Sequence, residues 1–137
     1  MKVENHYLQN QSVCLFCNLD KSRIIMANNS VFALYDSFPI TPGHSLIIPK
    51  RHISSFFEAT KEEQTALLDL LAEMRELLIH EKNPNGFNIG INDGAAAGQT
   101  VMHLHIHLIP RYEGDTADPR GGVRWIMPEK APYWKII

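Results

Sequence analysis

Three histidines alternate with apolar residues in the segment HLHIHLI, at His103, His105 and His107. Successive side chains of a strand point to opposite faces, so the three imidazoles are expected to share one face while their apolar neighbours point into a core. The segment is therefore the polar face of an ordinary strand, a metal site with imidazole ligands, or a nucleophilic centre in which an imidazole attacks phosphorus. The first interpretation is the weakest, because threonine or lysine would serve an exposed face equally well.

The residues before the histidines favour phosphate chemistry. Residues 94–100, GAAAGQT, form a glycine-bounded loop whose backbone N–H groups can hold phosphate oxygens. Asn92 belongs to an alternating segment and is expected on its polar face. Phosphoryl and nucleotidyl transfer depend mainly on positioning and charge stabilisation, and imidazoles beside such a loop can supply both.

The two cysteines, Cys14 and Cys17, have the spacing C-x-x-C. In a reducing compartment this spacing indicates metal or redox chemistry before a structural disulfide. The pair is therefore a second candidate centre of chemistry.

Composition limits the class of protein. A chain of 137 residues with 45% hydrophobic residues predicts one folded domain. A formal net charge of −2 argues against nucleic-acid binding through a basic surface. Residues 1–13 lack the apolar stretch of a secretion signal, and no apolar run approaches the roughly 18 residues of a membrane span. We expect a cytoplasmic protein.

The elements that must position these residues form an α+β domain. One long helix is predicted to begin after Thr60, which forms a capping box with Glu63, and to end at residues 83–86. Alternating or short apolar segments predict strands at residues 23–29, 30–36, 45–50, 87–93 and 101–110, with 121–127 as a candidate further strand. The result is an antiparallel sheet with the helix on one face.

Four segments together resemble the histidine triad (HIT) family. HLHIHLI matches its His-φ-His-φ-His-φ-φ signature, where φ is apolar, and the supporting segments are AGQTV (97–101), PGHSLIIPKRH (42–52) and CLFC (14–17). The resemblance covers residues 13–111, and within the tail (112–137) the segment DPRGGVRWIMPEKAPYW (118–134) is similar to a diadenosine-polyphosphate hydrolase-like subset. It implies a single HIT domain over residues 1–137, with about five strands, one long helix and a shorter one. It also implies a homodimer in which two sheets join, with the tail completing the site or the dimer.

The resemblance assigns a role to each histidine. His105 matches the nucleophile, which attacks the α-phosphorus of a purine nucleotide conjugate, such as a dinucleoside polyphosphate, to form a nucleotidyl-histidine. Water then releases a nucleoside monophosphate, and no organic cofactor is required. His107 matches the residue that contacts the phosphate and assists proton transfer, and His103 supports the arrangement. A histidine at position 107 favours hydrolysis over transfer to a sugar phosphate.

Further positions match the family's substrate contacts. They are Asp36 for the ribose hydroxyls, Asn92, Gly98, Gln99 and Thr100 near the phosphate, and Leu15, Phe16 and Leu34 for the base. From sequence alone, Gln99 is equally consistent with a solvent-facing loop residue. Leu15, Phe16 and Leu34 are equally consistent with core positions. His44 is interpreted as structural. The cations of the tail, Arg111, Arg120, Arg124 and Lys130, are candidates for contact with distal phosphates or for solvated charge.

The resemblance also implies a structural zinc site. Its ligands would be Cys14, Cys17, His52 and His103, because some members bind zinc at matching positions, and two thiolates with two imidazoles suit tetrahedral zinc. Two alternatives to the enzyme remain open: a nucleotide- and zinc-binding regulatory protein with little turnover, and a redox protein that works through the cysteines.

Overall fold

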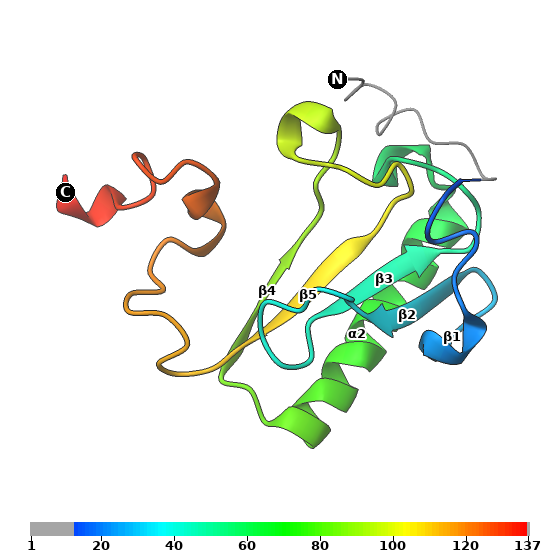
Figure 1. The fold of residues 1–137 in the computed structure, drawn as a ribbon, viewed down its shortest axis with the longest axis horizontal. Coiled ribbons are helices and arrows are strands. Elements are labelled where there is room, and N and C mark those ends of the chain that lie inside the picture. Colours follow the sequence, from blue (N-terminus) through cyan, green and yellow to red (C-terminus); the bar gives the residue numbers. More distant parts are fainter. Residues whose placement is uncertain (1–12, 137) are drawn as a thin grey trace.

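The computed structural model describes residues 13–136 and contains one five-stranded antiparallel sheet with one long helix across a face (Figure 1). The strand order is β1-β2-β3-β5-β4. The strands are β1 (Ile24–Ala27), β2 (Val31–Tyr35), β3 (Ser45–Pro49), β4 (Gly86–Gly90) and β5 (Ile106–Arg111), and the helix is α2 (Lys61–Lys82). The remaining helical segments are short 3-10 turns, namely η1 (Lys21–Arg23), η2 (Phe56–Glu58), η3 (Ala95–Ala97), η4 (Gly122–Ile126) and η5 (Tyr133–Lys135).

Among the described residues, no helix has the length and apolar character needed to cross a membrane. The expectation that residues 1–13 carry no secretion signal concerns a segment of which only Val13 is described.

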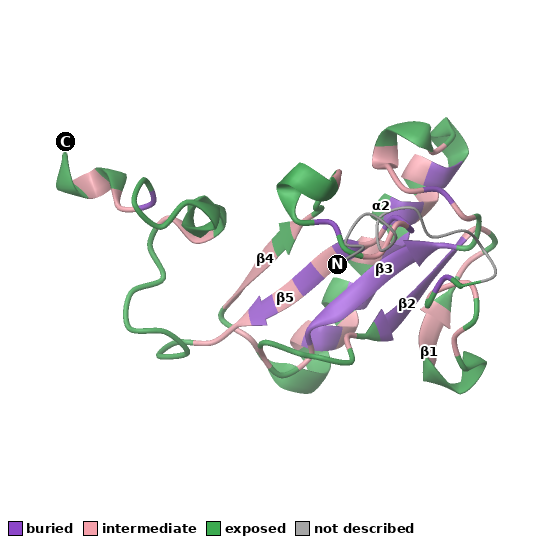
Figure 2. Ribbon diagram, turned by 45° about the horizontal axis from the view of Figure 1, so that its top comes forward, coloured by how far each residue is buried: buried purple, intermediate pink, exposed green. Residues whose placement is uncertain are grey.

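The sheet is buried on both faces near its centre, where β3 is buried along its whole length (Figure 2). One face packs on α2 through helix residues that are 0% exposed, namely Leu67, Leu70, Met74 and Leu78. The other face holds a second apolar cluster of Phe32, Leu34, Leu46 and Ile48, against which Phe16 and Leu19 pack. Full burial of one such side chain stabilises the fold by about 1.5–3 kcal/mol. The second cluster therefore anchors the segment that contains the two cysteines.

The predicted start of the long helix is confirmed. The Thr60 hydroxyl accepts a hydrogen bond from the N–H of Glu63 at 3.1 Å, and the Glu63 carboxylate accepts one from the N–H of Thr60 at 2.9 Å. Arg51 donates two further bonds to the Glu63 carboxylate, at 2.7 and 3.0 Å. The helix ends at Lys82, and the next residue, Asn83, has a left-handed φ of 50° that stops the helical hydrogen-bond pattern.

The strand predicted over residues 101–110 starts later than the sequence pattern indicates. β5 begins at Ile106, so His103 and His105 lie in an irregular segment before it, and Pro110 lies inside the strand. The cause is the pairing of this segment with a loop instead of a strand: Leu104 donates its N–H to the carbonyl of Ile53 at 2.7 Å. The inward direction of the apolar residues is nevertheless confirmed, since Leu104, Ile106 and Leu108 are all buried.

Two other strand predictions need correction. The strand predicted over 87–93 ends at Gly90, because its partner β5 begins only at Ile106 and Gly90 already pairs with His107. The segment 121–127 is not a strand but contains η4, which follows two glycines with left-handed φ angles of 92° and 46°. The tail extends past the β4 edge and away from the sheet (Figure 1).

Candidate active site and metal cluster

The position of His105 is controlled by a backbone carbonyl. Its Nδ1 lies 2.8 Å from the carbonyl oxygen of His103. A carbonyl oxygen can only accept a hydrogen bond, so Nδ1 of His105 carries the proton. Nε2 is then left with its lone pair. Burial lowers the pKa of His105 below its ordinary value and so favours the neutral ring, although the carbonyl and Asp36 act in the opposite direction. A neutral imidazole with an available Nε2 lone pair is the form that attacks phosphorus.

His107 is held by His44 in the same way. The N–H of Ile40 donates to His44 Nδ1 at 3.2 Å, so the proton of the neutral His44 ring is on Nε2. That nitrogen lies 2.9 Å from His107 Nδ1, which must accept and leaves the proton of His107 on Nε2. Burial first, and then the charges of His105 and His44, lower the pKa of His107 to about 4. The ring is therefore neutral at pH 7 and presents an N–H donor.

The sequence interpretation treated His44 as a structural residue and gave it no place in the site. It is 4% exposed and its Nε2 also lies 3.4 Å from the Asp36 carboxylate. The residue after it, Ser45, begins β3 and pairs with Leu108 of β5, which brings His44 beside the histidine motif. Knowledge that these two strands are neighbours would have identified it, but their order is not visible in the sequence.

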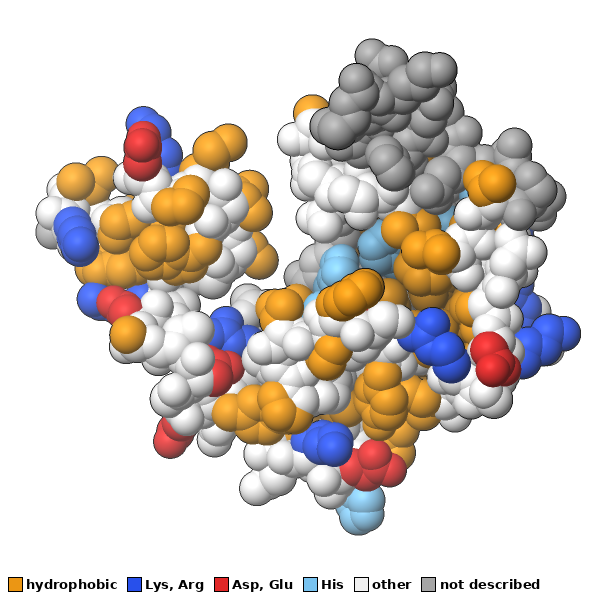
Figure 3. Space-filling model, in the orientation of Figure 1, with side chains coloured by type: hydrophobic (Ala, Val, Ile, Leu, Met, Phe, Trp, Pro, Cys, Tyr) orange, Lys and Arg blue, Asp and Glu red, His pale blue; other side chains and the backbone are white. Residues whose placement is uncertain are grey.

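One cavity of about 900 Å³ collects almost all of the predicted substrate contacts. Lining residues that were predicted from the sequence are Leu15, Phe16, Leu34, Asp36, Asn92, Gly98, Gln99, Thr100, His105 and His107. His103 alone of the predicted contacts does not line it. Figure 3 shows histidine side chains (pale blue) that reach the surface near the middle of one face of the molecule. The volume is sufficient for a small-molecule ligand of nucleotide size.

The glycine-bounded loop before the histidines is fixed by Gln99, which is 3% exposed. The Gln99 amide accepts from the N–H of Gly94 at 2.8 Å and donates to the carbonyl of Ser54 at 2.9 Å. Gly94 and Gly98 both have a φ of 96°, which favours glycine. The side chain of Gln99 thus shapes the loop, and it is not the solvent-facing residue that one interpretation allowed.

Asp36 directly follows β2, and hydrogen bonds fix both Asp36 and its two neighbours in the chain. Its Oδ1 accepts from the N–H of Phe38 at 2.9 Å. Arg23 donates to the carbonyl of Tyr35 at 3.1 Å and to the hydroxyl of Ser37 at 2.8 Å, and so joins the two residues that flank Asp36. Arg23 also lines the cavity, and nothing in its sequence context had indicated this position.

The structure brings the four predicted zinc ligands together. The ligand atoms of Cys14, Cys17, His52 and His103 all lie within 4.8 Å of one another. The Nδ1 atoms of His52 and His103 are 3.1 Å apart. Cys17 Sγ lies 3.3 Å from His52 Nδ1 and 3.5 Å from His103 Nδ1. These spacings and this donor set fit tetrahedral Cys₂His₂ coordination.

The surroundings of the cluster also fit a cation. His103 Nε2 donates to the carbonyl of Pro49 at 2.7 Å, which leaves Nδ1 as an acceptor toward the cysteines. Partial burial and the hydrogen bond with Cys14 raise the pKa of the Cys17 thiol to about 11, so this thiol stays protonated at pH 7 without a positive charge beside it. His103 therefore serves two centres, with its ring in the cluster and its carbonyl on His105.

The arginines of the tail are occupied within the tail and the sheet. Arg111 donates twice to Asp115, each time at 2.8 Å, and once to Asn88 at 2.6 Å. Arg120 bonds Asp118 and its guanidinium lies 4.4 Å from the Trp134 ring centre. Arg124 donates to the carbonyls at positions 130 and 131. Each of these three guanidinium groups therefore already has hydrogen-bond partners within the tail or the sheet, although Arg120 and Arg124 are also exposed to solvent.

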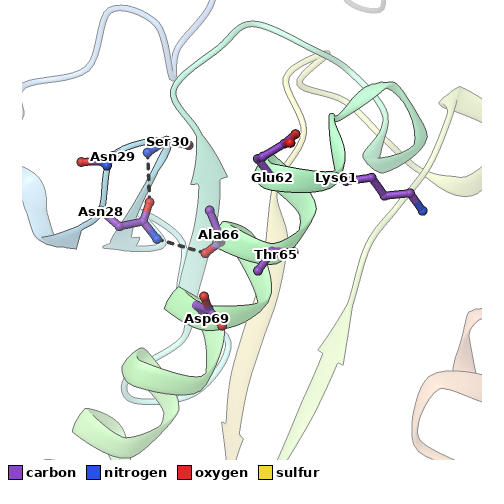
Figure 4. Close-up of a pocket in the computed structure, with 8 residues that line it drawn as sticks. All are labelled: Asn28, Asn29, Ser30, Lys61, Glu62, Thr65, Ala66 and Asp69. Carbon is purple, nitrogen blue, oxygen red and sulfur yellow. Dashed lines mark hydrogen bonds between the residues drawn. The ribbon is translucent and has the colours of Figure 1, made fainter.

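A hollow of about 620 Å³ lies on the opposite part of the fold, between the β1–β2 turn and the first turns of α2 (Figure 4). There the Asn28 amide bonds the backbone of Ser30 and the carbonyl of Ala66. Neither histidine nor cysteine lines this hollow, and its Asn28 amide groups are used in folding. The histidine cavity is therefore the candidate active site.

The HIT-domain family model matches residues 19–114, so this chain belongs to the histidine triad family. Among curated relatives, a HIT-like protein of Mycoplasma pneumoniae is 36% identical over 73% of this chain and 72% of its own length. An adenylylsulfatase of Arabidopsis thaliana is 34% identical over 83% of this chain and 59% of its own length. A zinc-bound histidine triad protein of Mycobacterium smegmatis has a TM-score of 0.70 and 28% identity, covering 80% of this chain and 82% of its own.

Proposed function

We propose that this protein is a nucleotide hydrolase that works through a covalent nucleotidyl-histidine on His105. The observation that carries the proposal is the bond from His105 Nδ1 to the His103 carbonyl, which leaves the lone pair of His105 on Nε2 in a ring that lines the cavity. Membership of the histidine triad family and similarity to the adenylylsulfatase of Arabidopsis thaliana support this class of activity. The substrate is a purine nucleotide conjugate, such as a dinucleoside polyphosphate, and the product is a nucleoside monophosphate.

The reaction has two steps. In the first, His105 Nε2 attacks the α-phosphorus, a nitrogen–phosphorus bond forms, and the bond from phosphorus to the leaving group breaks. In the second, water attacks phosphorus, the nucleoside monophosphate departs, and His105 is regenerated. His107 Nε2–H contacts the phosphate oxygens and, in its protonated form, gives a proton to the leaving group. The anionic substrate raises the pKa of His107 from its low value in the empty site.

Substrate orientation follows the lining of the cavity. Asp36 accepts hydrogen bonds from the ribose hydroxyls, which suits a carboxylate with two acceptor oxygens. The phosphate lies against Asn92 and the loop that contains Gly98 and Thr100. The base lies between apolar side chains, namely Leu15, Phe16 and Leu34. All of these residues line one cavity, which supports the assignment.

The test is the release of AMP from diadenosine polyphosphates, adenosine phosphoramidate and adenylylsulfate. We expect wild-type protein to release AMP from at least one of them and His105→Ala to lose at least about a thousandfold in kcat/KM, which corresponds to about 4 kcal/mol. Absence of AMP with an intact, folded wild-type protein would reject the enzyme. Full activity in His105→Ala would reject the mechanism.

A second candidate is a nucleotide- and zinc-binding regulatory protein with little turnover. The low pKa of His107 favours it, because a ring that stays neutral at pH 7 is a poor proton donor. Tight binding of AMP without turnover of any substrate would support this candidate over the enzyme.

We also propose that Cys14, Cys17, His52 and His103 bind one structural zinc ion. The ligand geometry and the zinc-bound relative support this. Zinc would supply charge that keeps both thiols ionised, and the proposed reaction has no step on the metal. Metal analysis of the purified protein is expected to find about one equivalent of zinc, and a Cys14→Ser/Cys17→Ser double variant is expected to lose it. Stoichiometric zinc in the double variant would contradict this ligand set.

A further inference from the structure

Arg23 is a cavity-lining residue to which the proposed function gives no role. It is the last residue of η1, it directly precedes β1, and it is exposed. Its Nη2 donates to the carbonyl of Tyr35 at 3.1 Å and to the hydroxyl of Ser37 at 2.8 Å. One nitrogen of the guanidinium group thus joins the residue before Asp36 to the residue after it.

The backbone on each side of Arg23 is fixed by contacts of its own. The Asp20 carboxylate caps η1 by accepting the N–H of Ser22 at 2.9 Å, and Arg23 donates its own N–H to the Asp20 carbonyl at 3.0 Å. The next residue, Ile24, begins β1, pairs with Leu34 of β2 and packs against the apolar cluster that contains Leu34. The guanidinium group therefore reaches the end of β2 from a backbone that is held in place.

The orientation of the Asp36 carboxylate depends on the turn that follows it. Residues 37–40 are exposed, and Oδ1 of Asp36 accepts the N–H of Phe38 at 2.9 Å. Ser37 lies between these two groups in the chain, so its position sets where the N–H of Phe38 lies. The bond from Arg23 to the Ser37 hydroxyl therefore fixes the donor that orients the carboxylate. A carboxylate that is already held in one orientation loses less freedom when a ligand binds to it.

We propose that Arg23 is a positioning residue for Asp36, and that through Asp36 it sets how strongly the site prefers nucleotides that carry both ribose hydroxyls. The inference rests on the proposed function, and in particular on its assignment of Asp36 to these hydroxyls. An arginine suits this task because its planar group holds its acceptors in fixed directions. In this role Arg23 acts on the recognition of ribose and leaves the chemistry at His105 unchanged.

The test measures the dissociation constants of AMP and of 2′,3′-dideoxy-AMP by isothermal titration calorimetry. The two ligands differ only in the hydroxyls that Asp36 accepts. We expect wild-type protein to bind AMP at least about tenfold more tightly, because hydrogen bonds to a charged group are among the stronger ones. Arg23→Met keeps a long side chain but removes its donors, and it is expected to lower this ratio of dissociation constants at least about threefold.

Matched variants separate positioning from general damage. Lys21→Met removes a cation from the same turn, but Lys21 does not line the cavity, so this variant is expected to keep the wild-type ratio. Arg23→Lys retains a donor and is expected to recover part of the preference. In an Asp36→Ala background, Arg23→Met is expected to leave the ratio unchanged, because a residue that acts through Asp36 has no effect on ribose once the carboxylate is gone. Ser37→Ala removes one acceptor of Arg23 and provides a second test if circular dichroism shows that Arg23→Met is misfolded.

The outcomes separate this inference from the proposed function. Absence of AMP binding, or equal binding of both ligands to wild-type protein, overturns the proposed role of Asp36 and the inference with it. A ratio that Arg23→Met and Ser37→Ala both leave at the wild-type value overturns the inference alone, even if both ligands bind more weakly. Because binding is measured without turnover, a protein that shows the expected ratios but releases no AMP from any conjugate supports the inference and rejects the hydrolase.

Discussion

At the scale of single residues, two hydrogen bonds decide which nitrogen carries the proton in His105 and in His107, the two rings that we propose as catalytic. The His103 carbonyl holds the proton of His105 on Nδ1, and His44 holds that of His107 on Nε2. The sequence motif predicted that His105 and His107 would line one site. It could not predict the role of His44, because that residue comes from a loop 63 positions away that only the strand order brings beside His107.

A substitution of His44 tests this arrangement. His44→Phe keeps a ring but removes the donor to His107, so we expect kcat to fall about 10- to 100-fold with a smaller change in KM. His44→Asn retains an N–H donor and is expected to recover part of the loss. Equal losses in both variants, or a change confined to KM, would show that His44 only fills space.

At the scale of elements, local signals were reliable where the contacts that fix an element are themselves local. The capping box of α2 involves Thr60 and Glu63, three residues apart, and both of its bonds form as predicted. The predicted start of β5 was wrong because the path of the residues before it depends on contacts with Ile53 and Pro49, about fifty residues earlier in the chain. The four metal ligands were predicted by resemblance alone, since their meeting depends on the whole fold.

The cap of α2 gives a prediction about stability and pH. Hydrogen bonds from Arg51 and from the Thr60 backbone lower the pKa of Glu63 from its ordinary value of 4.5 to about 2. A carboxyl group whose folded pKa is lowered stabilises the protein above its unfolded pKa, and this stabilisation is lost as the pH falls from about 4.5 to about 2. Because Arg51 is half exposed, we discount the effect to about 1–2 kcal/mol at pH 7.

Urea unfolding of Glu63→Gln and wild-type protein across this pH range measures the effect. The difference in free energy of unfolding is expected to be about 1–2 kcal/mol at pH 7 and to shrink steadily below pH 4.5. Glu62→Gln is the control, since Glu62 lies in the same helical turn and is exposed. A difference for Glu63→Gln that does not depend on pH would contradict this account of the cap.

At the scale of the whole molecule, the β4 edge is open and partly apolar. Ile89 in β4 and Ile91 just after it are 44% and 37% exposed. An edge strand with unpaired backbone groups and apolar side chains is a natural site for pairing with another chain. The homodimer implied by the family therefore remains a prediction, with the β4 edges of two copies as the proposed contact. The assignment of residues 1–137 to one domain also stays a prediction.

Light scattering on a sizing column tests the dimer. Wild-type protein is expected to have about twice the chain mass of 15.6 kDa. Ile91→Arg, which adds charge beside the β4 edge, is expected to shift the population toward the monomer with little change in the circular dichroism spectrum. A wild-type mass of one chain at micromolar concentration would count against the dimer.

The central claim is that His105 becomes covalently attached to the nucleotide, and rapid acid-free quenching of a turnover reaction followed by mass spectrometry tests it most directly. The account predicts that the peptide containing residues 103–109 gains one nucleoside monophosphate, attached to His105 through nitrogen, within the first turnovers. The adduct should be absent from His105→Ala. Rapid turnover of wild-type protein without any adduct on this peptide, or an adduct on another residue, would contradict the account.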